Sequence, residues 1–352
     1  MKLFNFPFLI QKEVLDHLSI NQTFFLSLCS KKTKNLILHT QKYQFQKIEF
    51  VDYFLNNNAV YIQMKCVSKD VPDTVFHFIK TPEDFETKYQ EFTVDELGMD
   101  FIRHMTNQTD IQAKYRSERL QSTLAAFHNH LYDLIGHQTT FRLGTCDLDI
   151  DLLPVLQNIQ MLTYAVTKFK ETEIEESLRK YSTIEDFVLM TLDGQNLELG
   201  ENSTIYELDT LYMRTKGPLA TKIMKCFNGR HVFVMQPNIQ TTDVIQFLNT
   251  WRTGEKFLNL EVINFDTLTT FQIPDIRHSV EFKEVGTDVE YSFARRFKTI
   301  SILPERFPSQ FKSHLYMVRQ SDGHVASVML TDSRIFMGVW NLTEMEFLEK
   351  FQ

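Results

Sequence analysis

The sequence predicts an α+β fold in which a small helical package precedes alternating strands and helices and a closing β-hairpin. Three observations support this prediction. Apolar residues recur at helical spacing within residues 6–38, strand-like and helix-like segments alternate between about residues 140 and 266, and an Asp-Gly pair separates two alternating segments near the C-terminus. The 352 residues suffice for about two domains.

The composition is that of an ordered soluble protein, with 43% hydrophobic and 23% charged residues. The net charge of −8, from 37 basic and 45 acidic residues, argues against a strong sequence-independent nucleic-acid binder, which needs a concentrated basic face. Phenylalanine is common, with 31 residues against two tryptophans. We expect many of these rings in the core and some at an interface.

The cysteines and the N-terminus bear on the compartment. The four cysteines are far apart and form no CxxC pair, which argues against a zinc ribbon or finger: Cys29, Cys66, Cys146 and Cys226. Sparse cysteines fit buried thiols in a reducing compartment. The apolar N-terminus stops at Gln11-Lys12-Glu13, too early for a secretory signal, and no apolar stretch approaches about 18 residues. We therefore expect a cytoplasmic or nuclear protein, or both, without a membrane partner.

The helical package of residues 6–38 is expected to contain three short helices. Pro7 precedes the first helix, where its fixed φ is favourable. The apolar residues of that helix share one stripe: Ile10, Val14, Leu15 and Leu18. Asn21 is a candidate N-cap for the second helix, and Ser30 for the third.

The second and third helices add further apolar side chains. Phe24 lies near the start of the second helix, and the third is expected to turn Leu36 and Ile37 inward and a basic run outward. One side of the second helix is expected to carry Phe25, Leu28 and Cys29. Three such short helices cannot bury all of this surface among themselves. A partner or the rest of the chain should cover part of it.

This stretch resembles the F-box. Phe6-Pro7 fills the opening apolar-Pro step, the four residues of the first stripe fall at the aliphatic positions, and the closing positions hold Leu26, Cys29-Ser30-Lys31 and Leu36. The resemblance implies docking on the small adaptor protein that links an F-box protein to a cullin. The residues it implies as contacts or supports are Pro7, Ile10, Val14, Leu15, Leu18, Leu26, Cys29 and Leu36.

Three positions depart from the F-box pattern. Leu9 stands where glutamate is usual, Gln11 where an aliphatic residue is common, and Thr33 where tryptophan is usual. The segment SLCSKKTKNLI looks like the nematode group of F-box proteins. The alternative is that residues 6–38 are only a helical cap on a globular protein. For the basic run at 31–34 the solvated face of a helix is favoured over a localisation signal or phosphate contact.

The next region, residues 41–136, is expected to combine strands with a helix. Strands are predicted within 43–54, 59–67 and 74–80, where apolar and polar residues alternate, with a turn at the three asparagines 56–58. Residues 82–116 have poor periodicity and are interpreted as a connector with short helices. Residues 117–135 form the best long helix, with Gly136 as its stop; its apolar face holds Leu120, Leu124, Phe127, Leu131 and Leu134.

From about 140 to 266, strand-like segments recur with centres about 22–28 residues apart, the range of leucine-rich and related solenoid repeats. They are residues 140–148, 161–169, 185–192, 209–216, 230–236 and 257–265. Helical segments are expected at 151–159, 171–181, 218–227 and 241–251. Because the consensus is loose, we interpret the region as an irregular leucine-rich-repeat-like α/β arc. The alternative is an ordinary doubly wound α/β domain.

A second resemblance covers much of residues 141–341. The segment TTDVIQFLNTWRTGEKFLNLEVINF is similar to a signature of the type 2 F-box-associated domain of nematode F-box proteins, and the segment from Ser313 to Trp340 to its closing hairpin. The matching residues are Phe247-Leu248, Trp251, Gly254, Leu258, Leu260-Glu261, Ile263, Arg319, Asp322-Gly323 and Trp340. The expected domains are therefore an F-box at 1–40, a strand-rich and helical connector at 41–136 and an F-box-associated domain at 137–352.

No residue group indicates catalysis, a metal or a cofactor. Asp147, Asp149 and Asp151 alternate, but without the glycine and closing glutamate of a calcium loop they are interpreted as a strand end and a helix cap. The histidines His128, His130 and His137 lack the spacing and companions of a metal site, and we expect solvated helix histidines. The sequence has no P-loop, GxGxxG, GxSxG or HExxH motif.

The function that the resemblance implies is that of a non-catalytic substrate-recognition subunit of a cullin-based, SCF-type ubiquitin ligase. The F-box would bind the adaptor and the C-terminal domain would hold an unidentified target protein, so that catalysis is by proximity. Strand alternation suggests these target-facing residues: Arg142, Thr163, Tyr212, Arg214 and Glu261. The alternatives are an F-box interaction protein that acts outside a ligase and an unrecognised α/β enzyme.

Overall fold

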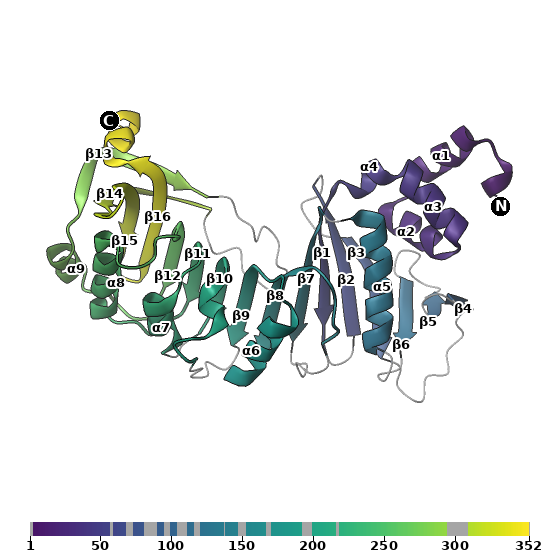
Figure 1. Cartoon of the computed structure of the whole chain (residues 1–352), viewed down its shortest axis with the longest axis horizontal. Helices are drawn as coiled ribbons and strands as arrows, with labels where there is room; N and C mark the ends of the chain where they lie inside the picture. The colour runs from purple at the N-terminus through teal and green to yellow at the C-terminus, as the bar shows by residue number, and fades with distance from the viewer. Residues whose placement is uncertain are drawn as a thin grey trace. The chain divides into compact units, whose positions relative to one another are not determined.

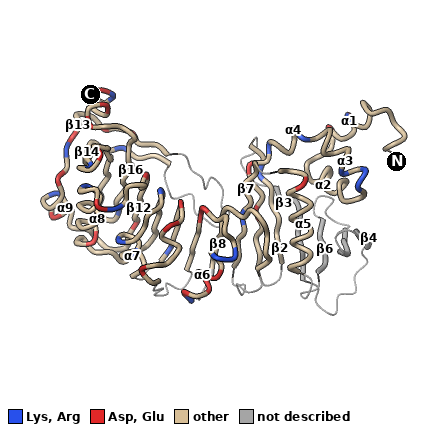
Figure 2. The backbone as a smooth tube through the Cα atoms, in the orientation of Figure 1, with Lys and Arg blue, Asp and Glu red and all other residues tan. Residues whose placement is uncertain are grey.

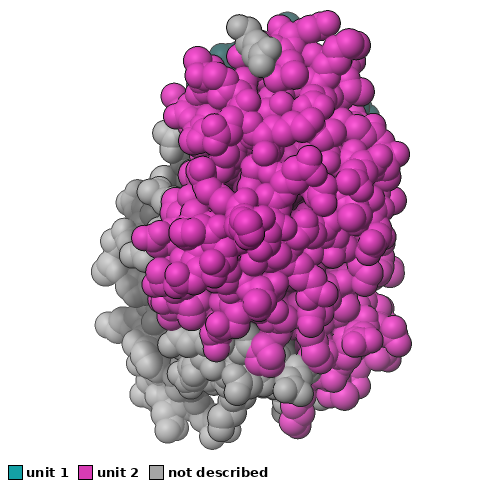
Figure 3. Space-filling view, turned by 90° about the vertical axis from the view of Figure 1, so that its left-hand side faces the viewer, with its two compact units in different colours: residues 1–161 teal, residues 162–352 magenta. Residues whose placement is uncertain are grey.

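The computed structural model describes residues 3–56, 59–67, 73–80, 90–94, 99–103, 111–115, 120–136, 138–146, 153–166, 170–191, 199–215, 218–293 and 309–351, with the backbone alone between 73 and 115. The chain divides into two compact units, residues 1–161 (unit 1) and 162–352 (unit 2) (Figures 1 and 3). N-terminal helices are followed by strands with interleaved helices, which confirms the predicted α+β class.

Short helices open unit 1. They are η1 (Leu3–Asn5), α1 (Phe8–Asp16), α2 (Ile20–Leu28), α3 (Lys31–Thr40) and α4 (Lys42–Phe45). Ser30 caps α3 as predicted, because its hydroxyl accepts a hydrogen bond from the Thr33 amide. The cap predicted at Asn21 is wrong. Ser19 caps α2, and its hydroxyl and the Gln22 side chain form a reciprocal capping box that Asn21 cannot match.

The sheet of unit 1 follows these helices. Its strands are β1 (Ile48–Leu55), β2 (Ala59–Cys66), β3 (Asp73–Lys80), β4 (Gln90–Val94), β5 (Met99–Arg103), β6 (Ile111–Tyr115) and β7 (Thr140–Cys146), in the order β7-β1-β2-β3-β6-β5-β4. The first three confirm the predicted strands, although Tyr43–Phe45 belongs to α4. The connector predicted at 82–116 is wrong, because this segment supplies the three strands β4, β5 and β6. They are short and pair with one another at the edge of the sheet, so periodicity within each is weak.

The long helix of unit 1 is α5 (Leu120–Ile135), which confirms the predicted helix over 120–135, while 117–119 lie outside the described residues. Gly136 follows it with a positive φ of 82°. The wide buried arc of α5 comprises Thr123, Leu124, Phe127, His128, His130, Leu131, Leu134 and Ile135. The prediction of solvated histidines is therefore wrong for His128 and His130. The helix is covered on two sides, by α2 and by β1.

Unit 2 continues with a strand–helix alternation. Its elements as far as residue 279 are β8 (Ile159–Val166), which begins in unit 1, α6 (Glu171–Lys180), β9 (Asp186–Thr191), η4 (Thr204–Glu207), β10 (Thr210–Arg214), α7 (Leu219–Cys226), β11 (His231–Met235), α8 (Thr241–Thr253), β12 (Val262–Asp266) and α9 (Ile273–Ser279). The helix predicted at 151–159 is wrong, since the described residues 153–158 are not helical. Asn158 there adopts a positive φ of 54°, which a helix does not allow.

The strands β9, β10, β11 and β12 are parallel and adjacent in chain order. A doubly wound sheet reverses its strand order at a switch point, and these four strands show no reversal. Helices α6, α7 and α8 lie along one face of this sheet (Figure 1). Nearly every residue of these strands is buried, which explains their continuous apolar runs.

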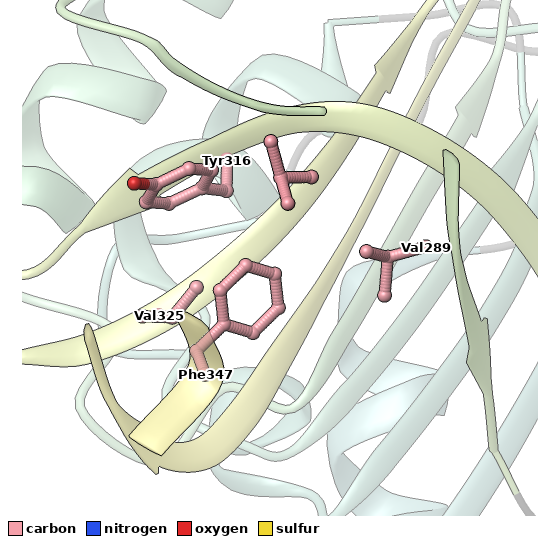
Figure 4. Close-up of a cluster of buried hydrophobic side chains, with 5 residues drawn as sticks. Val289, Tyr316, Val325 and Phe347 are labelled. Carbon is pink, nitrogen blue, oxygen red and sulfur yellow. The ribbon is translucent and has the colours of Figure 1, made fainter. Parts of the chain in front are cut away.

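An antiparallel segment ends unit 2. Its elements are β13 (Lys283–Ser292), β14 (Gln310–Val318), β15 (His324–Leu330), β16 (Arg334–Thr343) and α10 (Glu344–Phe351), and β16 joins it to β12. The turn predicted at Asp322-Gly323 is confirmed, with Gly323 at φ 75°. Figure 4 shows the side chains of Val289, Tyr316, Val325 and Phe347 directed toward one another, which packs α10 against the strands.

Candidate functional site

A row of exposed apolar side chains marks the first helix of unit 1. Phe6, Phe8, Leu9 and Ile10 are 42, 56, 75 and 47% exposed. Pro7 precedes α1 at φ −55°, and the Gln11 side chain donates a hydrogen bond to the Phe6 carbonyl at 2.7 Å, which fixes the start of the helix. Single exposed apolar residues are ordinary, but adjacent large ones mark a surface for association.

The residues that the sequence suggested for adaptor contact differ in exposure. Pro7, Ile10 and Cys29 are exposed, and Leu15 is completely buried. The half-buried residues are Val14, Leu18, Leu26 and Leu36. Sequence reasoning missed Phe8 and Leu9 as exposed apolar residues, although both are visible as large apolar side chains beside Pro7.

Buried side chains hold these helices together. Leu15, Phe24 and Ile37 are completely buried, and the Gln41 side chain donates to the Asp16 carboxylate at 2.7 Å. That hydrogen bond, with a second one from Lys12, lowers the pKa of Asp16. Thr33 is also buried, and its hydroxyl lies 2.8 Å from that of Ser30. A small hydrogen-bonded pair thus occupies the position where an F-box usually has tryptophan.

The helices α2 and α3 pack against helix α5. The rings of Phe24 and Phe127 lie 4.9 Å apart, and the Ser27 hydroxyl lies 2.8 Å from Nε2 of His130. Lys34 forms an ion pair with Asp133 at 2.8 Å. The basic run, whose lysines are blue in α3 in Figure 2, is therefore only partly a solvated face. Thr33 is buried, Lys34 pairs with Asp133, and the exposed Lys32 lies over the Phe4 ring at 4.3 Å. Desolvation lowers the pKa of His130 to about 4, so the imidazole is neutral at pH 7.

His128 faces the sheet on the other side of α5. Its Nδ1 lies 3.0 Å from the Tyr53 hydroxyl and its Nε2 lies 2.8 Å from the Gln157 carbonyl. Burial lowers its pKa to about 4, and the hydrogen bond to Gln157 opposes that shift. These hydrogen bonds assign both histidines structural roles. No group of three or more potential metal ligands occurs among the described residues; His137 and Asp147, Asp149 and Asp151 lie outside them.

Unit 2 has an open groove with a volume of about 750 Å³. It lies where β10, β11 and β12 begin, beside the β14–β15 turn and the end of β16. Its lining residues are Glu207, Asp209, Asn228, Gly229, Arg230, Leu258, Asn259, Leu260, Glu261, Arg319, His324, Val339, Trp340 and Asn341.

A charged residue directly precedes each of these three strands. Arg230 binds the Asp209 carboxylate with two hydrogen bonds, at 2.7 and 3.2 Å, and lies 3.3 Å from Glu261. Glu261 also lies 3.2 Å from Nε2 of His231. Hydrogen bonding from Arg230 to the Asp209 carboxylate is the main cause that raises the pKa of Arg230. Because parallel strands begin at the same edge of a sheet, these charges meet in the groove.

Arg319 is a buried arginine of the groove lining that holds the surrounding segments together. Its guanidinium binds Asp322 at 2.7 Å and reaches the Phe257 and Leu258 carbonyls at 3.3 Å, although the side chain is only 3% exposed. It also lies over the Trp251 ring, 5.2 Å from the centroid. The Arg319 hydrogen bond lowers the pKa of Asp322. Three of the residues quoted for the C-terminal resemblance therefore contact Arg319, namely Trp251, Leu258 and Asp322.

The predicted target-facing residues are mostly covered. Arg142, Thr163 and Tyr212 are 3–5% exposed, and Arg142 lies 3.6 Å above the Phe50 ring. Arg214 is half-buried and donates to the Gln236 side chain at 3.2 Å. Glu261 alone of the five lines the groove. Sequence reasoning missed Asp209 and Arg230, for which a charged residue recurring just before successive strands was the available signal. Arg319 was quoted only for the second resemblance and not as a residue of a binding surface.

None of the helices in the described part of the chain has the length and apolar character needed to cross a membrane. No curated protein and no solved structure matches the chain. The family model of the F-box domain matches residues 3–45, which run from η1 to α4. Residues 3–45 are therefore an F-box domain, which implies binding to the adaptor of SCF-type ubiquitin ligases.

Proposed function

We propose that this chain is a substrate-recognition subunit of a cullin-based, SCF-type ubiquitin ligase. The observation that carries the proposal is the exposed apolar row at the start of α1, within the F-box. Partner binding would remove Phe8, Leu9 and Ile10 from water, at about 25 cal/mol per Å² of apolar surface. An exposed apolar segment of this kind is otherwise a liability for aggregation.

The F-box residues divide into contacts and supports. Pro7, Ile10 and Cys29, which are all exposed, contact the adaptor. Leu15 is a support, because no part of it is accessible. The half-buried side chains can do both, and they are Val14, Leu18, Leu26 and Leu36. The exposed Leu9 provides an apolar contact where the usual F-box glutamate would provide a charge.

Unit 2 is the region that holds the target protein. The parallel strands in chain order support a leucine-rich-repeat-like arc. The proposal that this unit is a type 2 F-box-associated domain rests on the sequence resemblance alone. The groove at the strand starts is its binding surface, with Glu261 as a contact. Of the other predicted target residues, Arg214 is accessible in part, whereas Arg142, Thr163 and Tyr212 act as supports.

The chain acts without catalytic residues of its own. Its role is to raise the local concentration of a target lysine near a ubiquitin-charged enzyme, which is a proximity effect. No cofactor or metal takes part in this function.

The test is co-purification of the full chain with the cullin-linked adaptor. The wild type should retain the adaptor, and Ile10→Asp should weaken binding about 100-fold, because a charge would be desolvated in an apolar interface. Met345→Asp is the matched control, since Met345 is an exposed apolar residue of α10 in unit 2. Wild-type adaptor binding by Ile10→Asp would overturn the proposed docking face. Adaptor binding without ubiquitin transfer to any bound protein would instead favour a role outside a ligase.

A further inference from the structure

We propose that the groove of unit 2 binds a peptide segment of the target that carries a lysine or arginine side chain next to an apolar one. This inference rests on the proposed function, because it names the chemistry of the target. The groove is lined by three carboxylates and two guanidinium groups, and the accessibility of these groups decides which ligand it fits.

The guanidinium groups of the groove are already engaged. Arg319 is 3% exposed and directs its N–H groups to Asp322, to His324 and to two backbone carbonyls. Arg230 directs Nε and Nη2 to Asp209. An anionic ligand would have to break these hydrogen bonds to gain its own. The geometry therefore disfavours a phosphorylated or acidic peptide.

The carboxylates keep accessible acceptor capacity. The Glu261 side chain is 48% exposed, and its partners within the described part of the chain are Arg230 at 3.3 Å and His231 at 3.2 Å. Glu207 is exposed, and the Asn228 side chain donates to it at 2.9 Å. Each carboxylate has about four lone-pair sites, so both can accept further donors. A cationic side chain of the ligand would supply these donors and the missing charge.

The same groove offers an apolar contact beside these carboxylates. Leu258 is 54% exposed, and Val339 and Trp340 are half-buried. The Trp340 indole donates to the Ser327 hydroxyl at 2.9 Å, and its ring packs edge-on against Tyr291 at 4.9 Å. The ring is thus held in place before a ligand arrives, which limits the entropy lost on binding. A basic residue followed by an aliphatic or aromatic one matches both parts of the groove.

The experiment is a selection of 12-residue random peptides displayed on phage against the full chain bound to its adaptor. We expect peptides enriched in lysine or arginine adjacent to leucine, isoleucine or phenylalanine. A selected peptide, labelled with fluorescein, should bind the double variant Glu207→Gln/Glu261→Gln about tenfold more weakly by anisotropy, because glutamine keeps the shape and removes the charge. Glu281→Gln is the matched control, since Glu281 is an exposed glutamate that pairs with Arg252 outside the groove, and it should change affinity less than twofold.

Three outcomes would overturn the inference: no enriched sequence, an acidic consensus, or equal affinity of the double variant and the wild type. Adaptor co-purification is measured on the same samples. If the adaptor binds while basic peptides are not selected, only the groove inference fails. If the adaptor does not bind, the proposed function fails whatever peptide is found.

Discussion

The F-box and the groove of unit 2 present opposite chemistries on differently built supports. The F-box exposes phenylalanine, leucine and isoleucine on a nine-residue helix, and burial of Leu15, Phe24 and Ile37 holds that helix in place. The groove exposes carboxylates at the starts of parallel strands, and ion pairs around Arg230 and Arg319 hold them there. Salt does not screen apolar burial, whereas it screens exposed charges beyond about 10 Å at 0.1 M. The two surfaces should therefore respond differently to the same perturbation.

The comparison teaches that each surface depends on residues that are themselves hidden. Leu15 and Arg319 are buried and offer almost no surface to a partner. Each nevertheless fixes the elements that carry the accessible side chains of its surface. Four substitutions separate support from contact, from the largest expected effect to the smallest.

Leu15→Asp should have the largest effect, a loss of about 5 kcal/mol in the stability of the F-box helices, because it buries a charge and removes a packed side chain. Hydrogen exchange of the amides in α1–α3 measures it, and exchange in unit 2 should not change. Leu9→Asp is the matched control, since Leu9 is 75% exposed and its replacement should leave the exchange rates unaltered. Equal protection in Leu15→Asp and the wild type would contradict burial as the support of the F-box.

Arg319→Ala should destabilise unit 2 by about 4 kcal/mol, because it leaves Asp322 and two carbonyls without their buried partner. Urea unfolding followed by the fluorescence of Trp251 and Trp340, which both lie in unit 2, measures this loss. Arg277→Ala is the comparison, since Arg277 is half exposed and pairs loosely with Glu284 at 3.7 Å, so its loss should cost under about 0.5 kcal/mol. Similar losses for the two variants would show that the groove does not depend on its buried arginine.

Lowering the pH should act on unit 1 through the buried histidines. The pKa values of His128 and His130 are about 4 in the folded chain, against 6.5 for an unperturbed histidine, so the unfolded chain binds more protons between these values. Stability is fully present above pH 6.5 and falls as the pH drops toward 4, by about 2 kcal/mol per histidine between pH 7 and pH 5. Urea titrations at the two pH values measure it. Asp52 opposes this loss, because desolvation raises its pKa to about 6 in the folded chain. The difference between wild type and His130→Gln isolates one histidine: the variant should lose about 2 kcal/mol less between pH 7 and pH 5, and an equal loss would contradict the burial of His130.

Gly323→Ala should have the smallest effect, a loss of about 1 kcal/mol, because Gly323 has φ 75° and an added Cβ would meet no atom within 4 Å. The cost is then purely one of backbone conformation. Gly286→Ala in β13 is the control: its Cβ would also meet nothing, and its φ is ordinary, so stability should stay the same or rise slightly. The difference between the two midpoints of thermal unfolding measures the stability lost when a residue other than glycine adopts the left-handed conformation of this turn.

The sequence predicted those features that depend on neighbours in the chain. The Ser30 cap, the helix at 117–135 and the Asp322-Gly323 turn all follow from local hydrogen bonding and backbone preference. The strand–helix alternation was visible as well, because parallel strands buried on both faces give apolar runs separated by amphipathic helices.

The features it could not predict depend on distant contacts. His130 was predicted to be solvated because nothing nearby in the sequence indicates its hydrogen bond with Ser27, which lies 103 residues away. Likewise, the edge strands β4–β6 are defined by pairing with one another, not by strong patterns of their own. In the groove, Glu261 was among the predicted target-facing residues and Arg319 among those of the second resemblance, but Arg230 was not singled out. Its partner Asp209 lies 21 residues away in the sequence and is brought near by folding.

The packing of the F-box helices against α5 has a practical consequence. Phe127 and His130 are covered by Phe24 and Ser27 of the F-box, so a truncated chain that starts after residue 45 would strip these two residues of their cover. Such a deletion would expose apolar surface of α5, and proteins that bind there non-specifically would be mistaken for targets. Cells expressing all 352 residues with one exposed apolar residue of α1 replaced would show more directly which proteins this subunit binds.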